Sequence, residues 1–283
     1  MKKRILFIMH QATSDPGRIG EAAQEFGYEP EICRHSCGDP LPDSLEDYAA
    51  AAMFGGPMSA NDDHLPFIRT ELDWLDIPLR ENKPFLGICL GAQMLARVLG
   101  GSVMYHEDGF HEIGFYKVTA KHAGRDLFDD EQYFYQWHSE GFSLPSSNGG
   151  IEHLAASENF DNQAFRTGNA YGVQFHPDVT DEMMKKWSTM VAHRMVLPGA
   201  QARDRQLAGQ AAHGNYVDIW IRRFFRHWLP PTGGHVDPLA ISGIDWSAQD
   251  PSSKNNPAKP GVGAELRQAI RWIMNIHCGR LPA

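Results

Sequence analysis

Short apolar runs alternate with amphipathic segments through the first hundred residues of the chain. The runs have the length of buried strands, and the segments between them space their apolar residues with a helical period. The expected strands are Arg4–Met9, Glu29–His35, Tyr48–Phe54 and Pro84–Ile88, and the expected helices are Glu21–Phe26, Phe67–Arg80 and Gly91–Leu99. Pro78 predicts a kink or an early end in the second of these helices. Strands that alternate with helices predict an α/β fold with a mainly parallel sheet.

The pattern changes after Gly101. Short strand candidates now follow one another, separated by Gly, Ser and Asn, and helical spacing is absent. The candidates are Ile113–Thr119, Gln132–Trp137, Phe142–Leu144, Leu154–Ser157, Gln163–Arg166 and Ala170–Phe175. We expect this block to extend or flank the sheet with antiparallel or mixed strands.

The last third of the chain is predicted to be helical and then irregular. Asp181–Arg194 should form a helix, and Gln201–Trp228 one long helix or two. A stretch rich in Gly, Pro, Ser and Asn follows Pro230-Pro231, and Ala264–His277 has the spacing of a final amphipathic helix. We therefore predict a domain over residues 1–229 and a C-terminal extension over 230–283, to which the sequence assigns no role.

Charge and composition exclude several classes of function. Lys and Arg number 26 against 35 Asp and Glu, which gives a formal charge of −9 and argues against a nucleic-acid-binding role. The apolar run Ile5–Met9 is shorter than the roughly 7–15 residues of a signal peptide or the roughly 20 of a membrane span. Four cysteines are too few for a disulfide scaffold. We expect a cytoplasmic protein with reduced thiols.

The strongest local sign of chemistry is the segment Gly87-Ile88-Cys89-Leu90-Gly91. It joins a buried strand directly to a helix, which is typical of an elbow that presents a nucleophile. Glycines flank the nucleophile because the turn is sharp and side chains there would collide. The N-terminus of the following helix favours a thiolate. The alternative is a cysteine that only packs in the core.

A cysteine nucleophile needs a base and an orienting group from elsewhere in the chain. His176 ends the apolar run 171–175, and Asp178 follows two residues later. Residues i and i+2 of an extended segment point to the same side, so Asp178 can accept a hydrogen bond from the imidazole. The alternative is a surface His-Pro turn.

A tetrahedral intermediate also needs hydrogen-bond donors for its oxyanion. The elbow provides one of them, the backbone N–H of Leu90. Gly56, in the Gly55-Gly56-Pro57 segment that ends an expected strand, is the candidate for the other. The alternative for this segment is an ordinary Gly-Pro turn.

Three ordered motifs together resemble the class I glutamine amidotransferases, and most of all the stand-alone proteins similar to the glutaminase domain of GMP synthase. They are Phe54-Gly55-Gly56-Pro57-Met58-Ser59, Lys83-Pro84-Phe85-Leu86-Gly87-Ile88-Cys89-Leu90-Gly91-Ala92-Gln93 and Tyr171-Gly172-Val173-Gln174-Phe175-His176-Pro177. The resemblance covers roughly Lys3 to Trp228. We expect a flavodoxin-like, doubly wound sheet with the site at the carboxyl ends of its strands and a C-terminal helical extension.

The resemblance implies a role for each matching residue. Cys89 would attack the γ-carboxamide of glutamine, and His176 would act first as base and then as acid for ammonia. Gly56 and Leu90 would stabilise the oxyanion. Gln93, one helical turn past the elbow, would hold the amino-acid end of the substrate.

Two segments depart from the family pattern. Trp137-His138-Ser139-Glu140 resembles an aromatic-His-Gly-Asp segment that also holds the amino-acid end of glutamine, so His138, Ser139 and Glu140 are substrate-binding candidates. Ser139 and Glu140 replace the usual Gly and Asp. Asp178 stands where the family usually has Glu, which is one methylene longer, and it orients His176 only if the backbone lies slightly closer.

The predicted reaction releases ammonia from a γ-glutamyl amide through a thioester on Cys89. The chain contains no recognisable synthetase site, so an ammonia acceptor enzyme would be a separate polypeptide. One alternative is a hydrolase of γ-glutamyl peptides or γ-glutamyl amines, and a second is a non-catalytic regulatory subunit. We predict no cofactor and no metal, because Cys33, His35 and Cys37 lack a second pair of ligands.

Overall fold

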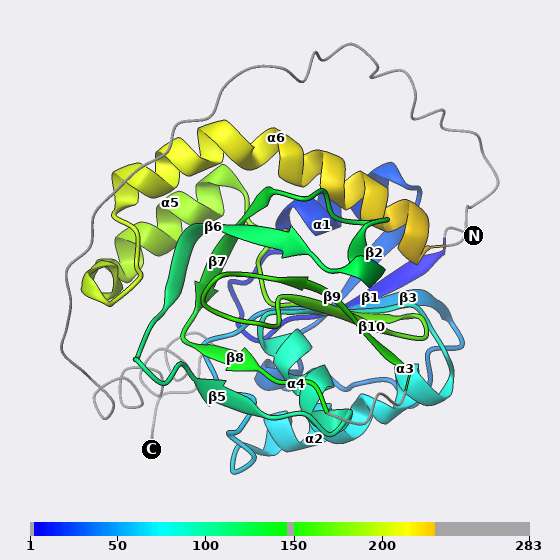
Figure 1. Cartoon of the computed structure of the whole chain (residues 1–283). Helices are drawn as coiled ribbons and strands as arrows, with labels where there is room; N and C mark the ends of the chain where they lie inside the picture. Colours follow the sequence, from blue (N-terminus) through cyan, green and yellow to red (C-terminus); the bar gives the residue numbers. More distant parts are fainter. Residues whose placement is uncertain (1–2, 146–149, 230–283) are drawn as a thin grey trace.

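A nine-stranded sheet runs through the centre of the molecule (Figure 1). The computed structural model describes residues 3–145 and 150–229. In spatial order, the strands are β2 (Glu29–Cys33), β1 (Arg4–Ile8), β3 (Tyr48–Met53), β4 (Phe85–Ile88), β11 (Ala170–Val173), β10 (Ala164–Thr167), β9 (Ile151–Ala156), β6 (Glu112–Ala120) and β7 (Gln132–His138). The strands from β2 to β11 pair in parallel and the remaining neighbours are antiparallel. This confirms the predicted α/β fold, in which antiparallel or mixed strands extend the parallel part of the sheet after Gly101.

Helices cover both faces of the sheet. On one face lie α1 (Gly17–Glu25) and α6 (Arg203–Trp228), and on the other α2 (Pro66–Trp74), α3 (Asp76–Arg80) and α4 (Leu90–Val98). The side chains of β1 alternate between these layers: Phe7 belongs to the core under α1 and α6, whereas Ile8 belongs to the core under α2 and α4. Both faces are therefore apolar, as a doubly wound sheet requires.

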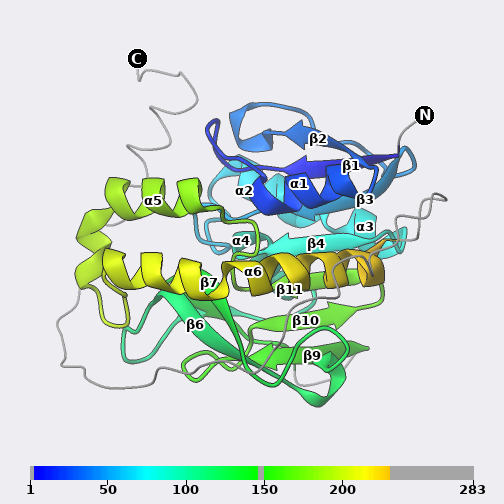
Figure 2. The ribbon, with the colours of Figure 1, turned by 90° about the horizontal axis from the view of Figure 1, so that it is seen from above.

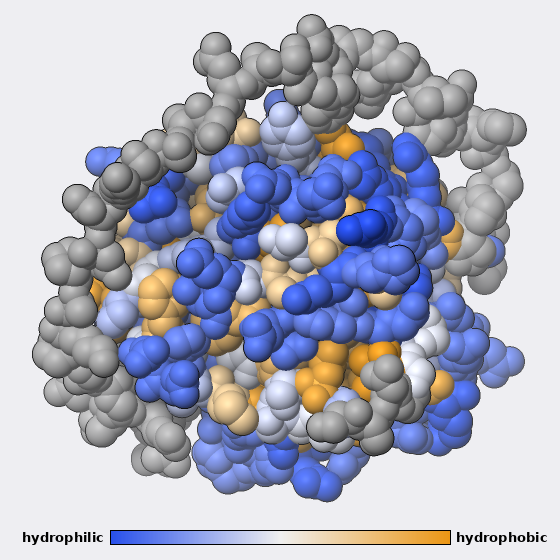
Figure 3. Space-filling view, in the orientation of Figure 1, coloured by the Kyte–Doolittle hydropathy of each residue, from blue (hydrophilic) through white to orange (hydrophobic). Residues whose placement is uncertain are grey.

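The remaining elements lie at the edges of these layers. A small antiparallel sheet pairs β5 (Val103–Tyr105) with β8 (Glu140–Phe142), and α5 (Asp181–Met190) precedes α6. Short 3-10 turns are formed by η1 (His35–Cys37), η2 (His122–Gly124) and η3 (Ala192–Val196). Hydrophilic residues cover most of the face shown in Figure 3.

Pro78 divides the expected helix Phe67–Arg80 in two. Helix α2 ends at Trp74, and α3 begins at Asp76. Proline has no N–H to donate to the carbonyl of Trp74, and its ring would collide with that carbonyl in a continuous helix. The predicted interruption is confirmed.

The apolar patch near residue 220 belongs to one continuous helix, α6, which lies beside α1 (Figure 2). Trp220, Phe224 and Phe225 are buried against the sheet, whereas Ile219 is 37% exposed on the same helix. The Arg18 guanidinium of α1 donates to the Gly214 carbonyl oxygen at 2.8 Å. The first and last described helices thus form one layer.

Truncation of Phe224 to alanine should lower the free energy of unfolding by about 3–5 kcal/mol, because it removes a fully buried ring from the core. Ile219→Ala on the exposed side of the same helix is the matched control and should change the value by only about 0.5 kcal/mol. Chemical denaturation of both variants measures the difference. Equal effects would show that α6 does not stabilise the sheet through this face.

The C-terminal boundary, the cysteines and the membrane prediction differ in how far the described residues bear on them. The extension 230–283, with its expected helix Ala264–His277, lies outside them, so the boundary at 229 stays a prediction. Cys33 and Cys89 carry free thiols. None of the helices in the described ranges is both long and apolar enough to cross a bilayer.

Candidate active site

Cys89 lies at the sharp turn between β4 and α4. Its backbone has φ +51° and ψ −105°, which is a strained conformation for a residue with a side chain. A Cβ on Gly87 would lie 2.6 Å from the backbone of Gly91, and one on Gly91 would lie 2.1 Å from the Met53 carbonyl oxygen. Both flanking glycines are therefore needed for the close packing of strand against helix, as the sequence predicted.

Strand pairing brings His176 to Cys89 across 87 positions of sequence. β11 pairs in parallel with β4, with Val173 opposite Ile88, and the Cys89 N–H donates to the Val173 carbonyl at 2.8 Å. The loop after β11 therefore begins beside the elbow. The His176 N–H donates to the Tyr135 carbonyl of β7 at 2.8 Å, which fixes the backbone of this loop.

Asp178 reaches the imidazole of His176 despite its shorter side chain. Its Oδ1 lies 3.2 Å from Nδ1, and both residues are buried. The start of α1 packs closely against the backbone here: Arg18 N–H donates to the Asp178 carbonyl at 3.0 Å, and a Cβ on Gly17 would lie 2.0 Å from that oxygen. The turn before α1 thus holds Asp178 against the ring, with Gly17 leaving the space.

The charges around His176 favour its protonated form. Burial lowers the pKa of the imidazole, but the attraction of Cys89 and the carboxylate of Asp178 exceeds this effect and raises the pKa to about 10. The ring between these two groups is therefore an imidazolium at neutral pH. A cysteine beside an imidazolium is the arrangement in which a thiolate is stabilised.

The Gly55-Gly56 backbone lies against the same pair. A Cβ on Gly55 would lie 2.7 Å from His176 Cε1 and 3.4 Å from the Cβ of Cys89. A Cβ on Gly56 would lie 3.0 Å from the Leu90 side chain. The two segments predicted to supply oxyanion donors therefore meet next to Cys89, one at the end of β3 and the other at the start of α4.

Two glutamines connect the elbow to the substrate-binding candidates. Gln93 Nε2 donates to the Glu140 carbonyl oxygen at 2.8 Å and to Gln174 Oε1 at 3.2 Å. The amide Nε2 of Gln174 lies 3.7 Å from the sulfur of Cys89. Sequence reasoning assigned no role to Gln174, although its place two residues before His176 on an extended segment was a usable signal.

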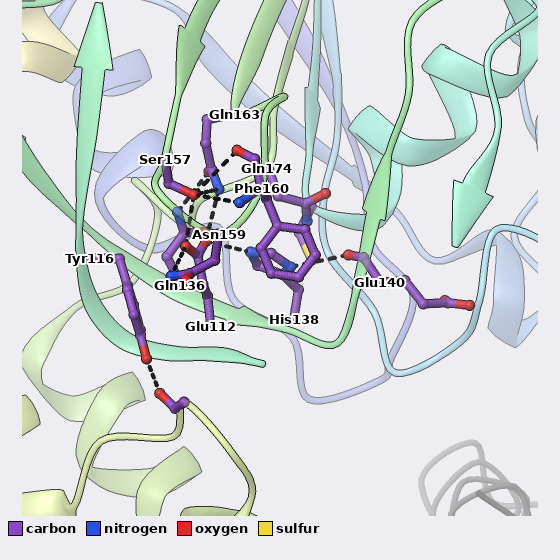
Figure 4. Close-up of polar contacts among 12 residues, drawn as sticks. Glu112, Tyr116, Gln136, His138, Glu140, Ser157, Asn159, Phe160, Gln163 and Gln174 are labelled. Carbon is purple, nitrogen blue, oxygen red and sulfur yellow. Dashed lines mark hydrogen bonds and ion pairs between the residues drawn. The ribbon is translucent and has the colours of Figure 1, made fainter. Parts of the chain in front are cut away.

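His138 is held by a buried polar network (Figure 4). Its Nε2 lies 3.1 Å from Glu112 Oε2, and its Nδ1 lies 3.0 Å from the Glu140 carbonyl oxygen. Ser157 and Gln163 donate to Glu112 at 2.7 and 2.8 Å. Because both ring nitrogens already have partners, His138 supports the loop that carries Glu140.

Ser139 and Glu140, the two departures from the family pattern, contact distant parts of the chain. Ser59 Oγ donates to Glu140 Oε1 at 3.0 Å. Arg194 of η3 donates to Ser139 Oγ at 2.7 Å, and its buried Nε has no hydrogen-bond partner among the described residues. Burial lowers the pKa of Arg194, while Cys89 acts in the opposite direction. Arg194 thus joins η3 to the Ser139 segment, and no sequence motif indicated this contact.

Two hollows of the molecule lie away from the predicted site residues. One hollow of about 440 Å³ lies beside Ser143 and His153, and a second of about 460 Å³ lies between α5 and α6. None of the predicted site residues lines either hollow. Within residues 3–145 and 150–229, no group of three or more His, Cys, Asp or Glu is placed to hold a metal ion. The strained turn and the His176–Asp178 pair coincide at Cys89, which makes it the candidate nucleophile.

The chain matches a known protein family over a range that includes these residues. The profile of the family described as glutamine amidotransferase class-I matches residues 18–189, more than half of the chain. The chain belongs to this family. The matched range contains the Cys89 elbow, the Gly55-Gly56 segment and the His176–Asp178 pair.

Individual relatives have related names and the same architecture. The chain is 27% identical to the glutamine amidotransferase-like protein YfeJ of Salmonella typhimurium over 64% of this chain and 78% of that one. It is 36% identical to a subunit of the glutamine-hydrolyzing GMP synthase of Sulfurisphaera tokodaii over 48% of this chain and 70% of that one. Glutamine amidotransferase structures from Thermotoga maritima and Methylobacillus flagellatus superpose with TM-scores of 0.71 and 0.74, at 29% and 28% identity, over 81% and 83% of this chain and 98% of each of theirs.

The match to some relatives is partial. The GMP synthase of Pyrobaculum aerophilum is 39% identical over 140 residues, which is 48% of this chain and 25% of that protein. The shared part is thus about a quarter of the longer enzyme.

Proposed function

We propose that this protein is a cysteine amidohydrolase that cleaves the γ-amide of glutamine or a related γ-glutamyl compound and releases ammonia. The observation that carries the proposal is the strained elbow at Cys89 beside the charged His176–Asp178 pair. Membership of the class-I glutamine amidotransferase family supports it.

Acylation would begin with attack of Cys89 Sγ on the γ-carbonyl carbon. The sulfur–carbon bond forms, and the carbonyl π electrons move to the oxygen, which then carries a negative charge. The N–H groups of Gly56 and Leu90 are the proposed donors to this oxyanion. The His176 imidazolium transfers its proton to the nitrogen, the carbon–nitrogen bond breaks, and ammonia leaves the γ-glutamyl thioester.

Deacylation would use the same groups, with His176 now accepting a proton instead of donating one. The neutral His176 ring removes a proton from water, the hydroxide oxygen bonds to the thioester carbon, and the sulfur leaves as thiolate. Asp178 keeps the ring oriented through Nδ1 and stabilises its charged form in both half-reactions. The γ-carboxylic acid that forms loses its proton to solvent to give glutamate, and the enzyme is left with the thiolate and the protonated His176 ring, ready for another cycle.

The amino-acid end of the substrate would lie between Arg194 and Glu140. The Arg194 guanidinium, with its buried and unpartnered Nε, offers positive charge to an α-carboxylate. The Glu140 carboxylate offers negative charge to an α-ammonium group, and Gln93 and His138 hold the Glu140 backbone. In this proposal Ser139 contributes through Arg194, to which its hydroxyl is hydrogen-bonded.

Two kinds of leaving group, ammonia and a larger amine, fit the same thioester chemistry. The name of the Sulfurisphaera tokodaii relative, which is one subunit of a GMP synthase, supports a partner in the form of a separate synthetase polypeptide. Hydrolysis of γ-glutamyl peptides or amines needs the same thioester and differs only in what leaves. The intact elbow and charged pair speak against a purely regulatory role. A cytoplasmic location stays a prediction of the sequence.

Glutamate release from the full chain tests the proposal. Purified protein should form glutamate and ammonia from glutamine, or glutamate and the free amine from a γ-glutamyl dipeptide, because both are cleaved through one thioester. Enzymatic assay of glutamate with each substrate separates amidotransferase from peptide hydrolase. A protein that releases glutamate from neither compound would contradict the proposed chemistry and favour the regulatory alternative.

A further inference from the structure

His10 and Glu71 form a fully buried pair beneath the Gly55-Gly56 backbone. His10 lies just after the end of β1, and Glu71 lies in α2, so the two come from different parts of the chain. Neither residue is exposed, and His10 Nε2 lies 2.9 Å from Glu71 Oε2. The other carboxylate oxygen of Glu71 has no hydrogen-bond partner among the described residues. The carboxylate therefore depends on His10 for its neutralisation.

The second ring nitrogen of His10 contacts the oxyanion segment. Nδ1 lies 3.2 Å from the Gly55 carbonyl oxygen. Both partners of the ring are acceptors, a carboxylate and a carbonyl, so both nitrogens carry a proton when Glu71 is ionised. The pKa of His10 agrees: burial lowers it, but Glu71 and the backbone carbonyls raise it above its ordinary value. With Glu71 ionised, His10 therefore donates one proton to the carboxylate and the other to the Gly55 carbonyl oxygen.

This hydrogen bond fixes the direction of the neighbouring N–H. The Gly55 carbonyl and the Gly56 N–H belong to one planar peptide unit, which is trans because the described residues contain no cis peptide. In a trans peptide the C=O and the N–H point in opposite directions. A carbonyl held toward His10 therefore turns the Gly56 N–H away from His10. A Cβ on Gly56 would lie 2.9 Å from the Cβ of His10, so the backbone also rests directly on this side chain.

We propose that His10, anchored by Glu71, is a positioning residue that aligns the Gly56 N–H as an oxyanion donor. The inference rests on the proposed function, since the donor has a task only if an oxyanion forms. Stability alone gives little reason for this pair, because a buried ion pair is often no more stabilising than apolar side chains of the same volume. Its contact with the site through Gly55 gives it a role in catalysis.

His10→Ala tests the proposal in the full chain, with the alkylation of Cys89 by iodoacetamide measured beside glutamate release. Alkylation needs the thiolate but no oxyanion donor, whereas hydrolysis needs both. The variant should lose about 10²–10³-fold in kcat, the usual effect of removing one such donor, with KM nearly unchanged. The alkylation rate should stay within about twofold of wild type, since the His176–Asp178 pair is intact.

Two variants of Glu71 keep the test decisive if His10→Ala does not fold. Glu71→Gln can donate to Nε2 of a neutral ring whose Nδ1–H still binds Gly55, so it should retain more than about a tenth of kcat. Glu71→Ala leaves the ring unanchored and should lose kcat as His10→Ala does. A parallel loss of alkylation and hydrolysis would overturn the proposal in favour of a structural role, as would unchanged kcat in both alanine variants. An inactive wild-type protein would instead contradict the proposed function.

Discussion

Replacement of Cys89 by serine or alanine is expected to lower the kcat of glutamate release by about 10⁶-fold, the scale of loss when a triad nucleophile is removed. The elbow presents this one side chain to the Gly56 and Leu90 segments, from which the proposed oxyanion donors come. The fold should survive, because serine and alanine are no larger than cysteine. Glutamate release and a thermal unfolding curve, measured on the same preparation, check both parts.

Cys33 provides the matched control. It is also a buried free thiol, but it lies at the end of β2, away from the elbow. Burial and nearby carboxylates raise its pKa to about 11, so it should react slowly with iodoacetamide at neutral pH. Cys33→Ser should therefore keep normal turnover, and alkylation of wild-type protein should label Cys89 first. Normal turnover after complete modification of Cys89 would exclude the thioester mechanism.

Loss of the Asp178 carboxylate is expected to reduce kcat by about 10²–10⁴-fold. The carboxylate orients the His176 ring through its 3.2 Å contact with Nδ1 and stabilises the imidazolium. Asp178→Ala removes both effects, whereas Asp178→Glu restores the charge and has the chain length usual in the family. Steady-state turnover of the two variants separates them, and near-normal activity of Asp178→Ala would show that another group orients the ring.

The same variant has a predictable pH signature. The pKa of His176 in the folded protein, about 10, lies above the value of about 6.5 expected for an unfolded chain. The protonated ring therefore stabilises the fold fully below about pH 6.5, and this contribution is lost as the pH rises toward 10. Asp178→Ala lowers the pKa of His176 by removing a negative neighbour. The stability difference between wild type and variant should therefore shrink across this window, as pH-dependent denaturation can measure.

Features that depend on one continuous segment could be predicted from the sequence. The glycines around Cys89 predicted the elbow because their spacing reflects a local steric need, and a Cβ at Gly87 or Gly91 would indeed meet backbone. Pro78 predicted the break between α2 and α3 for a similarly local reason. His176 and Asp178 were predicted to face one another because they are two residues apart on an extended segment.

Features that depend on distant pairing were not predictable. Nothing near His10 indicates that its partner is Glu71, 61 positions away, and nothing near Ser139 indicates Arg194. Such contacts can be predicted only when the order of the strands in the sheet is known. The role of Gln174 was missed for a different reason, since its motif was recognised but its side chain was not considered. The short strand β5 was missed because three residues carry too little periodicity.

The pairing of α1 with α6 has a consequence for the order in which the molecule can be completed during synthesis. The residues between the end of α1 and the start of α6 include strands β3 to β11, so the sheet is complete only at Val173. The ribosome adds about 30 more residues before α6 begins, which takes roughly 1.5–6 s. Over these residues the apolar surface that Trp220, Phe224 and Phe225 later bury has no cover from α6. The nascent protein therefore exposes one face of its sheet until the last described helix emerges, and chaperones would have their clearest target there.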